Sequence, residues 1–251
     1  MHATTFPRFF KRLLWLYLPT LILLVFVLLP FYWMLITSLK QDRNIFDPEA
    51  NPFWFNMTPT LKHYINLINP DKTDFLIWVQ NSLMVASLVT LISVSIGILA
   101  GYSLARLRFK GAETIGSSVF ITYLVPPSLL FLPLSHVIGQ LGLMETRWAM
   151  VLSYPTFLVP FCTWLLMGYF RTIPKEIEEC ALVDGCTRLK ALLRIVLPVA
   201  IPGIITAALF SFTLSWGEYL YSITFVTDSY EKTIPAAVGG GLIRGDVYHW
   251  G

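Results

Sequence analysis

The sequence has little charge. Only 13% of its 251 residues are Asp, Glu, Lys or Arg, whereas 55% are hydrophobic, and a soluble domain carries about 25% charged residues on its surface. This balance excludes an ordinary soluble protein and places the chain in a membrane. The net charge of +3 is explained by membrane orientation and gives no reason to expect nucleic acid as a partner.

Motifs for nucleotide, metal and nucleophilic chemistry are also missing from the sequence. There is no GxxxxGK[ST] phosphate loop, no HExxH motif and no nucleophile and base pair of an intramembrane enzyme. The cysteines Cys162, Cys180 and Cys186 have no histidine at ligand spacing, which favours small reduced thiols over a metal or redox site. We therefore expect no catalytic residue, no metal and no cofactor in this chain.

Long hydrophobic runs are what the sequence does contain. A membrane core requires about 20 mostly apolar residues per helix, and five runs meet this length: Trp15–Leu39, Asn81–Ala105, Ile115–Ile138, Trp148–Phe170 and Ile201–Val226. The first run is too long for a signal-peptide core and is followed by no cleavage pattern, so we expect it to be retained. Five spans in an all-α membrane protein are predicted.

The basic residues between these spans are unevenly distributed. One side holds eleven of the 18: Arg8, Lys11, Arg12, Arg106, Arg108, Lys110, Arg171, Lys175, Arg188, Lys190 and Arg194. Because Lys and Arg in short loops mark the cytoplasmic side, residues 1–14 and 171–198 are predicted to be cytoplasmic and residues 227–251 external. Five crossings leave the C-terminus outside, and we expect a sixth span beyond Gly251, with a five-span protein as the alternative.

Two local patterns concern the packing of the spans. Small residues recur every fourth position in the second span, at Ser93, Gly97, Gly101 and Ala105, which predicts a face where a neighbouring helix approaches closely. Prolines lie in the third span, at 126, 127 and 133, and in the fourth, at 155 and 160. Each removes a backbone donor, so kinked helices are expected.

The segment from 171 to 198 is too structured for a simple connection. Pro174 suits the first turn of a helix, Gly185 can close that helix in the left-handed conformation, and Thr187 can cap the next one. In the second helix, an apolar stripe is formed by Leu189, Leu192, Leu193 and Val196. Such a stripe needs a cover: the membrane surface, the protein's own helix ends or a soluble partner.

This segment resembles the EAA loop of ATP-binding-cassette (ABC) importer permeases. The likeness rests on residues 178–185, EECALVDG, followed by Ile195, Leu197, Pro198 and Pro202. Cys180 and Cys186 stand where the family usually has alanine, a small departure. Residues 81–82 (NS), 102–111 (YSLARLRFKG) and 216–219 (WGEY) are similar to maltose-type, binding-protein-dependent sugar permeases of the inner membrane.

The resemblance implies a single type I ABC permease domain over residues 1–251. Its implied partners are a dimer of ABC ATPase subunits that bind ATP and Mg²⁺, a second homologous permease, an extracytoplasmic solute-binding protein, a carbohydrate and membrane lipid. The residues implied in ATPase coupling are Glu178, Glu179, Ala181, Asp184, Gly185 and Leu189. The alternative is that the two glutamates simply keep the helix start soluble and favour the helix dipole, and this would be the preferred explanation without the downstream Asp-Gly and Ile-x-Leu-Pro pattern.

A polar stripe marks a candidate solute pathway in the fifth span. Ser211, Ser215, Glu218 and Ser222 fall on one face of a continuous helix, and a carboxylate inside a membrane is a candidate functional group. Trp216 and Tyr219 add aromatic faces suited to sugar rings. Structural roles for the serines and for Glu218 are the alternative, and in an ion-coupled transporter Glu218 and His136 would be the coupling groups.

The external glycines at Gly239, Gly240 and Gly241 resemble the loop that in this family approaches the binding protein. Glycine allows close backbone approach. Plain mobility explains the same composition.

Overall fold

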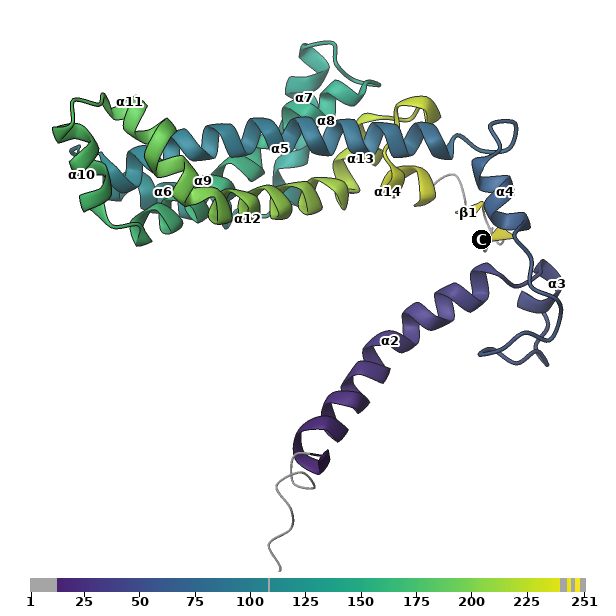
Figure 1. Ribbon diagram of the computed structural model, residues 1–251. Coiled ribbons are helices and arrows are strands. Elements are labelled where there is room, and N and C mark those ends of the chain that lie inside the picture. The colour runs from purple at the N-terminus through teal and green to yellow at the C-terminus, as the bar shows by residue number, and fades with distance from the viewer. Residues whose placement is uncertain (1–12, 108, 240–242, 245–246, 249–251) are drawn as a thin grey trace, which may run out of the picture. The chain divides into compact units, whose positions relative to one another are not determined.

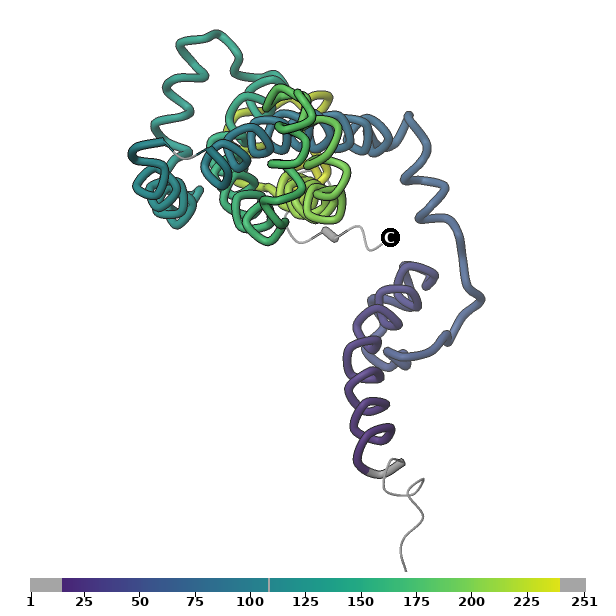
Figure 2. Tube along the Cα trace, turned by 60° about the vertical axis from the view of Figure 1, so that its left-hand side comes forward, coloured from purple at the N-terminus to yellow at the C-terminus, as the bar shows by residue number. Residues whose placement is uncertain are grey.

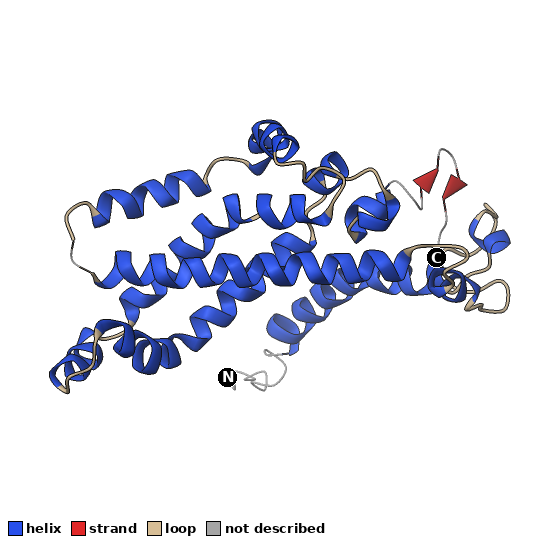
Figure 3. Cartoon of the chain, turned by 90° about the horizontal axis from the view of Figure 1, so that it is seen from above, coloured by secondary structure: helices blue, strands red, loops and turns tan. Residues whose placement is uncertain are grey.

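The computed structural model describes residues 13–107, 109–239, 243–244 and 247–248, and nearly all of its ordered segments are helices (Figure 3). The chain forms two compact units. The first comprises Met1–Thr73 with Gly245–Gly251, and the second comprises Asp74–Arg244. Each is described below by itself.

The first unit is built around the first predicted span. A π-helical turn, η1 (Leu13–Tyr17), continues into α2 (Leu18–Ser38), and Trp15–Ser38 is long and apolar enough to cross a membrane. Its side chains are apolar on all sides and mostly exposed, as expected of a helix that contacts lipid. The short helices α3 (Asp42–Ile45) and α4 (Lys62–Ile68) follow, and strand β2 (Val247–Tyr248) belongs to the same unit.

The second unit is organised along one long helix, α5 (Phe75–Arg106), which packs against α9 (Pro155–Thr172) and α12 (Leu197–Trp216) (Figures 1 and 2). The predicted small-residue seam lies between α5 and α9. A Cβ atom on Gly97 would lie 2.7 Å from the Cβ of Cys162, and one on Gly101 would lie 2.9 Å from the backbone nitrogen of Met167. The prediction of close packing at this face is confirmed.

The third predicted span is broken where its prolines lie. It consists of α6 (Ala112–Tyr123) and α7 (Pro127–Gln140), and the two helices are bent by 92°. Pro126 and Pro127 remove two consecutive backbone donors, and the residue before a proline avoids helical geometry, so the expected kink becomes a full break. The pair counts as one crossing only if the membrane accommodates this bend.

The last two predicted spans have different bounds in the structure. The helices α8 (Arg147–Ser153) and α9 join into one candidate span, Arg147–Thr172. The other candidate begins at Arg188 in α11 (Arg188–Ala191), passes through the π-helical turn η2 (Leu192–Val196) and ends with α12 at Trp216. The predicted continuous helix from Ile201 to Val226 is therefore wrong in its C-terminal part.

After the break at Gly217 the chain forms only short elements. These are α13 (Leu220–Phe225), the 3-10 turn η3 (Ser229–Glu231), α14 (Ile234–Ala237) and strand β1 (Ile243–Arg244). Within the described residues there are four candidate membrane helices, or five when the bent pair is one span. The predicted all-α membrane fold is confirmed.

Candidate functional site

The segment between α9 and α11 forms the helix-turn-helix that its sequence predicts. Helix α10 (Lys175–Val183) begins after Pro174, and acidic side chains lie in its first turn, where they favour the helix dipole. Gly185 has a φ of 81°, and two bonds close the helix: Gly185 N–H donates to the Leu182 carbonyl and Cys186 N–H to the Ala181 carbonyl. This is a Schellman motif. The Thr187 hydroxyl accepts the Lys190 N–H and caps α11.

The predicted coupling residues divide into two sets by exposure. Glu178 is 5% exposed and Ala181 is 3% exposed, so both side chains face the interior of the second unit. Glu179, Asp184, Gly185 and Leu189 are exposed, as is Val183 at 87%. The tip of the segment thus presents two carboxylates and two uncovered apolar side chains to whatever lies outside it.

Glu178 joins α10 to the end of α5 through a cluster that we call the inner latch, formed by Tyr102, Arg106 and Glu178. The Tyr102 hydroxyl donates to Glu178 Oε1 at 2.6 Å, and Arg106 Nε lies 3.8 Å from Glu178 Oε2. Arg106 Nη2 also donates to the Ile173 carbonyl at 2.6 Å, directly before α10. Arg106 and Glu178 are both buried, so each charge depends on the other for compensation.

The predicted polar stripe does not lie on one continuous helix. Ser211 and Ser215 lie on α12 and Ser222 on α13, and all three are buried. The Ser222 hydroxyl is hydrogen-bonded to that of Thr233 at 2.8 Å, whereas the hydroxyls of Ser211 and Ser215 have no hydrogen-bond partner among the described residues. The serines therefore point into packed protein.

Glu218 has a clear structural role at the break between α12 and α13. Its carboxylate accepts the Tyr154 hydroxyl at 2.8 Å and the backbone N–H of Tyr221 at 3.1 Å. A carboxylate that accepts the first backbone donors of a helix caps it. Glu218 thus starts α13 and ties it to α9, which begins immediately after Tyr154.

Two aromatic residues lie on either side of this break, Trp216 before it and Tyr219 after it. Trp216 is stacked on Phe212, with ring centroids 5.7 Å apart and planes at 23°, and Tyr219 is 44% exposed. A Cβ atom on Gly239 would lie 3.2 Å from the Tyr219 ring, so glycine allows this segment to approach that ring. Gly240 and Gly241 lie outside the described residues.

His136, the other group considered for ion coupling, lies on α7. Its Nε2 is 3.0 Å from the side-chain amide of Gln140, one helical turn later. This local pair accounts for the imidazole without a contact to Glu218.

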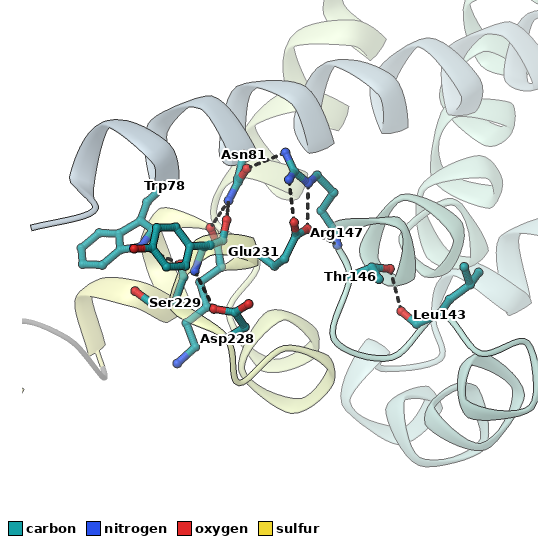
Figure 4. Close-up of polar contacts among 10 residues, drawn as sticks. Trp78, Asn81, Leu143, Thr146, Arg147, Asp228, Ser229 and Glu231 are labelled. Atoms are coloured by element: carbon teal, nitrogen blue, oxygen red, sulfur yellow. Dashed lines mark hydrogen bonds and ion pairs between the residues drawn. The ribbon is translucent and has the colours of Figure 1, made fainter. Parts of the chain in front are cut away.

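At the N-terminal end of α5, opposite the inner latch, a polar cluster holds the segment from η3 to α14 (Figure 4). We call it the outer clamp: Trp78, Asn81 and Ser82 of α5, Arg147 at the start of α8, and Glu231 of η3. Arg147 donates two hydrogen bonds to the Glu231 carboxylate, from Nη2 at 2.6 Å and from Nε at 2.8 Å. Its Nη1 donates to Asn81 Oδ1 at 3.0 Å. Bidentate pairs of this kind are strong and directional.

A neighbouring contact joins the turn between α7 and α8 to the predicted external segment that begins at residue 227. Glu145, in the turn between α7 and α8, accepts the backbone N–H of Thr227 at 2.7 Å and its hydroxyl at 2.9 Å. Hydrogen bonding of this backbone N–H to the carboxylate is the main reason that the pKa of Glu145 is lowered. The segments at 139–147 and after 227 therefore meet at one end of the second unit.

The outer clamp should weaken at low pH. The pKa of Glu231 is lowered chiefly by the side-chain hydrogen bonds from Arg147, so its contribution to stability is present above the unfolded-state pKa and is lost as the pH falls through the folded-state pKa. We expect the difference in Tm between the wild type and Glu231→Gln to be largest near neutral pH and to shrink on acidification. A difference that stays constant with pH would contradict this role for the carboxylate.

Sequence reasoning found part of this arrangement and missed part of it. Residues 81–82 and 102–111 were singled out only as family-like, with no partner named for Asn81, Tyr102 or Arg106. Neither Arg147 nor Glu231 was singled out as a candidate residue. An arginine placed directly at the start of a predicted span is the one local signal that could have drawn attention to the outer clamp.

Comparison with known proteins agrees with this geometry. Residues 93–241 match the family described as "Binding-protein-dependent transport system inner membrane component". The chain is 35% identical over 228 residues to the inner membrane ABC transporter permease protein YcjP of Escherichia coli, covering 91% of this chain and 80% of the relative. It is 32% identical to the trehalose/maltose transport system permease protein MalG of Thermococcus litoralis, covering 94% and 82%.

Solved structures show the same fold. A bacterial ABC transporter involved in the import of the acidic polysaccharide alginate has a chain that matches 95% of this one and 81% of its own length, with a TM-score of 0.75 and 18% identity. A second structure, of an alginate transporter with a pentasaccharide-bound periplasmic protein, matches with a TM-score of 0.66.

The fold and the helix-turn-helix between spans define a multispanning permease of the ABC importer class. The chain belongs to the family of binding-protein-dependent transport system inner membrane components. It is a transport subunit of the inner membrane that crosses it several times.

Proposed function

We propose that this chain is one of two permease subunits of an ATP-driven importer that takes up a carbohydrate delivered by an extracytoplasmic binding protein. Sugar uptake is named for several relatives, including trehalose/maltose and maltodextrin permeases, and this favours a carbohydrate over other solutes. The same relatives favour an ABC importer over ion-coupled transport. ATP and Mg²⁺ are bound by the partner ATPase. The N-terminus lies on the same cytoplasmic side as residues 171–198, which we call the coupling segment.

The exposure of the tip of the coupling segment is the main observation in support of the proposed ATPase contact. Val183 and Leu189 are uncovered apolar side chains, and Glu179 and Asp184 are exposed carboxylates beside them. An apolar centre with a polar rim is the usual composition of a protein interface. In this proposal Glu179, Asp184, Gly185 and Leu189 contact the ATPase, whereas Glu178 and Ala181 support the segment from inside.

Replacing Val183 by aspartate should abolish recovery of the ATPase when the tagged chain is purified. A charge placed at the centre of a desolvated contact is costly, and substitution of the few residues that dominate an interface costs about 2 kcal/mol or more, which corresponds to about 30-fold in affinity. Tyr230→Asp is a matched control, because Tyr230 is also exposed but lies at the other end of α5. Full recovery with Val183→Asp, and with a deletion of residues 179–185, would contradict this coupling contact.

For the solute pathway, exposure favours the two aromatic residues of the predicted set over the serines. The serines at 211, 215 and 222 are buried, whereas Tyr219 is exposed and Trp216 is partly exposed, with one ring face stacked on Phe212. Sites for small molecules combine such apolar walls with a few oriented polar groups. We propose that the two rings contact the carbohydrate and that Glu218 orients this region.

Uptake measurements can separate these roles. Trp216→Ala should lower the rate of sugar uptake by about tenfold, because a stacking surface worth about 1.4 kcal/mol is lost, while assembly with the ATPase stays intact. Glu218→Gln should lower uptake less, since an amide oxygen still accepts the Tyr154 hydroxyl. Phe53→Ala, at an exposed aromatic ring of the first unit, is the control. Unchanged uptake with Trp216→Ala would remove this ring from the pathway.

A further inference from the structure

Helix α5 contacts both functional ends of the second unit. The coupling segment with α10 and α11 lies at one end of α5, and α13 and α14 lie at the other (Figure 1). At about 1.5 Å per residue, a helix of 32 residues spans about 48 Å. No proline interrupts α5, so it lacks the usual cause of a hinge.

The outer end of α5 holds the main chain of the segment that leads to Gly239. Trp78 Nε1 donates to the Ser229 carbonyl at 2.9 Å, and Asn81 Nδ2 donates to the carbonyls of Tyr230 and Lys232 at 2.8 and 3.0 Å. These bonds join side chains of α5 to backbone atoms of the segment, and Trp78 and Asn81 are both buried. The segment cannot be displaced without either breaking these bonds or moving α5.

The same end of α5 receives further bonds from the segment. Ser82 Oγ accepts the Ile234 N–H at 2.8 Å, and the Ser229 hydroxyl donates to Asp74 Oδ2 at 2.7 Å. Asn81 itself is oriented by Arg147, which donates to its Oδ1. The attachment therefore extends over about the first two turns of the helix, so the segment is held along the axis of α5 and not at a single point.

The inner end of α5 holds α10 in a comparable way. Tyr102 donates a hydrogen bond to Glu178 on the buried face of α10, and Arg106 forms an ion pair with Glu178 and donates to the Ile173 carbonyl before the start of α10. Arg106 Nε and Nη1 are buried and have no hydrogen-bond partner among the described residues. A buried guanidinium that is only partly paired is costly. A movement of α10 that gives Arg106 further hydrogen-bond partners would therefore be favourable.

Between the two ends, α5 is pressed against α9 along the glycine seam, where side chains would not fit. Close-packed helices shift as bodies and do not deform continuously. Helix α5 is thus one rigid element that is bonded at one end to the external segment, residues 229–239, and at the other end to α10, which we call the coupling helix.

We propose that α5 transmits the docking of the binding protein to the coupling helix, with Asn81 and Tyr102 as positioning residues at its two ends. This inference rests on the proposed function, since it assigns how the external and cytoplasmic partners affect each other. Coupling between two sites requires an element whose state both sites bias, and α5 with the outer clamp and the inner latch meets this description.

A double-mutant cycle on the assembled transporter tests the inference. The measured quantity is the ratio of the ATPase rate with solute-loaded binding protein to the rate without it, in proteoliposomes. We expect Asn81→Ala and Tyr102→Phe each to lower this ratio about fivefold or more, the lower range of known couplings. The double variant should be no worse than either single variant, because both interrupt one path.

Controls separate the possible outcomes. Ser95→Ala changes an exposed position in the middle of α5 and should leave both rates unchanged, and Ser82→Ala is a milder outer variant if Asn81→Ala folds poorly. Losses that multiply in the double variant, or an unchanged ratio in both single variants, would overturn transmission through α5. A wild-type transporter that recovers no ATPase, or shows no stimulation, would instead contradict the proposed function.

Discussion

Replacing Gly101 by valine is expected to prevent α5 and α9 from packing, with loss of most of the folded protein. A Cβ atom at this position would lie 2.9 Å from the Met167 backbone nitrogen and 3.1 Å from the Thr163 carbonyl oxygen. Backbone atoms of a helix cannot move away from such a clash, whereas the end of a flexible side chain can. Overpacking typically costs about 1–3 kcal/mol, and we expect the top of this range or more because the two helices must separate along their whole contact.

The measurement is the yield and Tm of detergent-solubilised protein by fluorescence-detected size exclusion. Total stabilities of about 5–15 kcal/mol make a loss of this size visible in both quantities. The matched control is Gly168→Ala on α9, where an added Cβ meets nothing within 4 Å and alanine favours the helix. A Gly101→Val protein with wild-type yield and Tm would show that the seam does not determine how α5 and α9 pack.

Replacing Arg106 by methionine should have the second largest effect. It removes the donor to the Ile173 carbonyl and leaves Glu178 buried next to Tyr102 without its nearest buried cation. Arg188 lies 3.9 Å from Glu178 but is largely exposed, so it compensates weakly. Breaking one side of a buried ion pair typically costs about 3 kcal/mol or more, and we expect a Tm decrease of several degrees.

A rescue experiment distinguishes charge compensation from simple loss of packing. The double variant Arg106→Met with Glu178→Met removes both charges, and apolar replacements of a buried pair are often neutral for stability. Its Tm should therefore recover most of the loss seen with Arg106→Met alone. Arg171→Met, at an exposed arginine in the last turn of α9, should leave Tm nearly unchanged. A double variant less stable than the single one would rule out the unpaired charge as the cause.

These two predictions fall on features that the sequence revealed to different degrees. The glycine seam was readable from spacing alone, because four small residues at helical periodicity can only pack against something close. The inner latch was not readable, because the partners Arg106 and Glu178 are 72 positions apart and nothing local joins them. The outer clamp is similar, since Asn81 and Tyr230 lie 149 positions apart.

The turn between α10 and α11 was predicted in detail because it is determined locally. A glycine with positive φ and a threonine cap act within a few residues of themselves, so their roles survive any tertiary arrangement. The stripe in the last span failed for the opposite reason. Periodicity assumed a continuous helix through residue 222, but Gly217 and the capping by Glu218 end one helix and begin another.

For this protein, the sequence alone determined the membrane class, the approximate spans, the seam and the helix-turn-helix formed by α10 and α11, since each depends on hydrophobicity or on local backbone chemistry. Outside the seam, only the tertiary structure decided which side chains are buried and which partners they meet. That decision turned Glu178 inward and Val183 outward, made Glu218 a helix cap, and joined Arg147 to Glu231. Such outcomes depend on contacts between distant segments, and a linear pattern contains no information on which segments will meet.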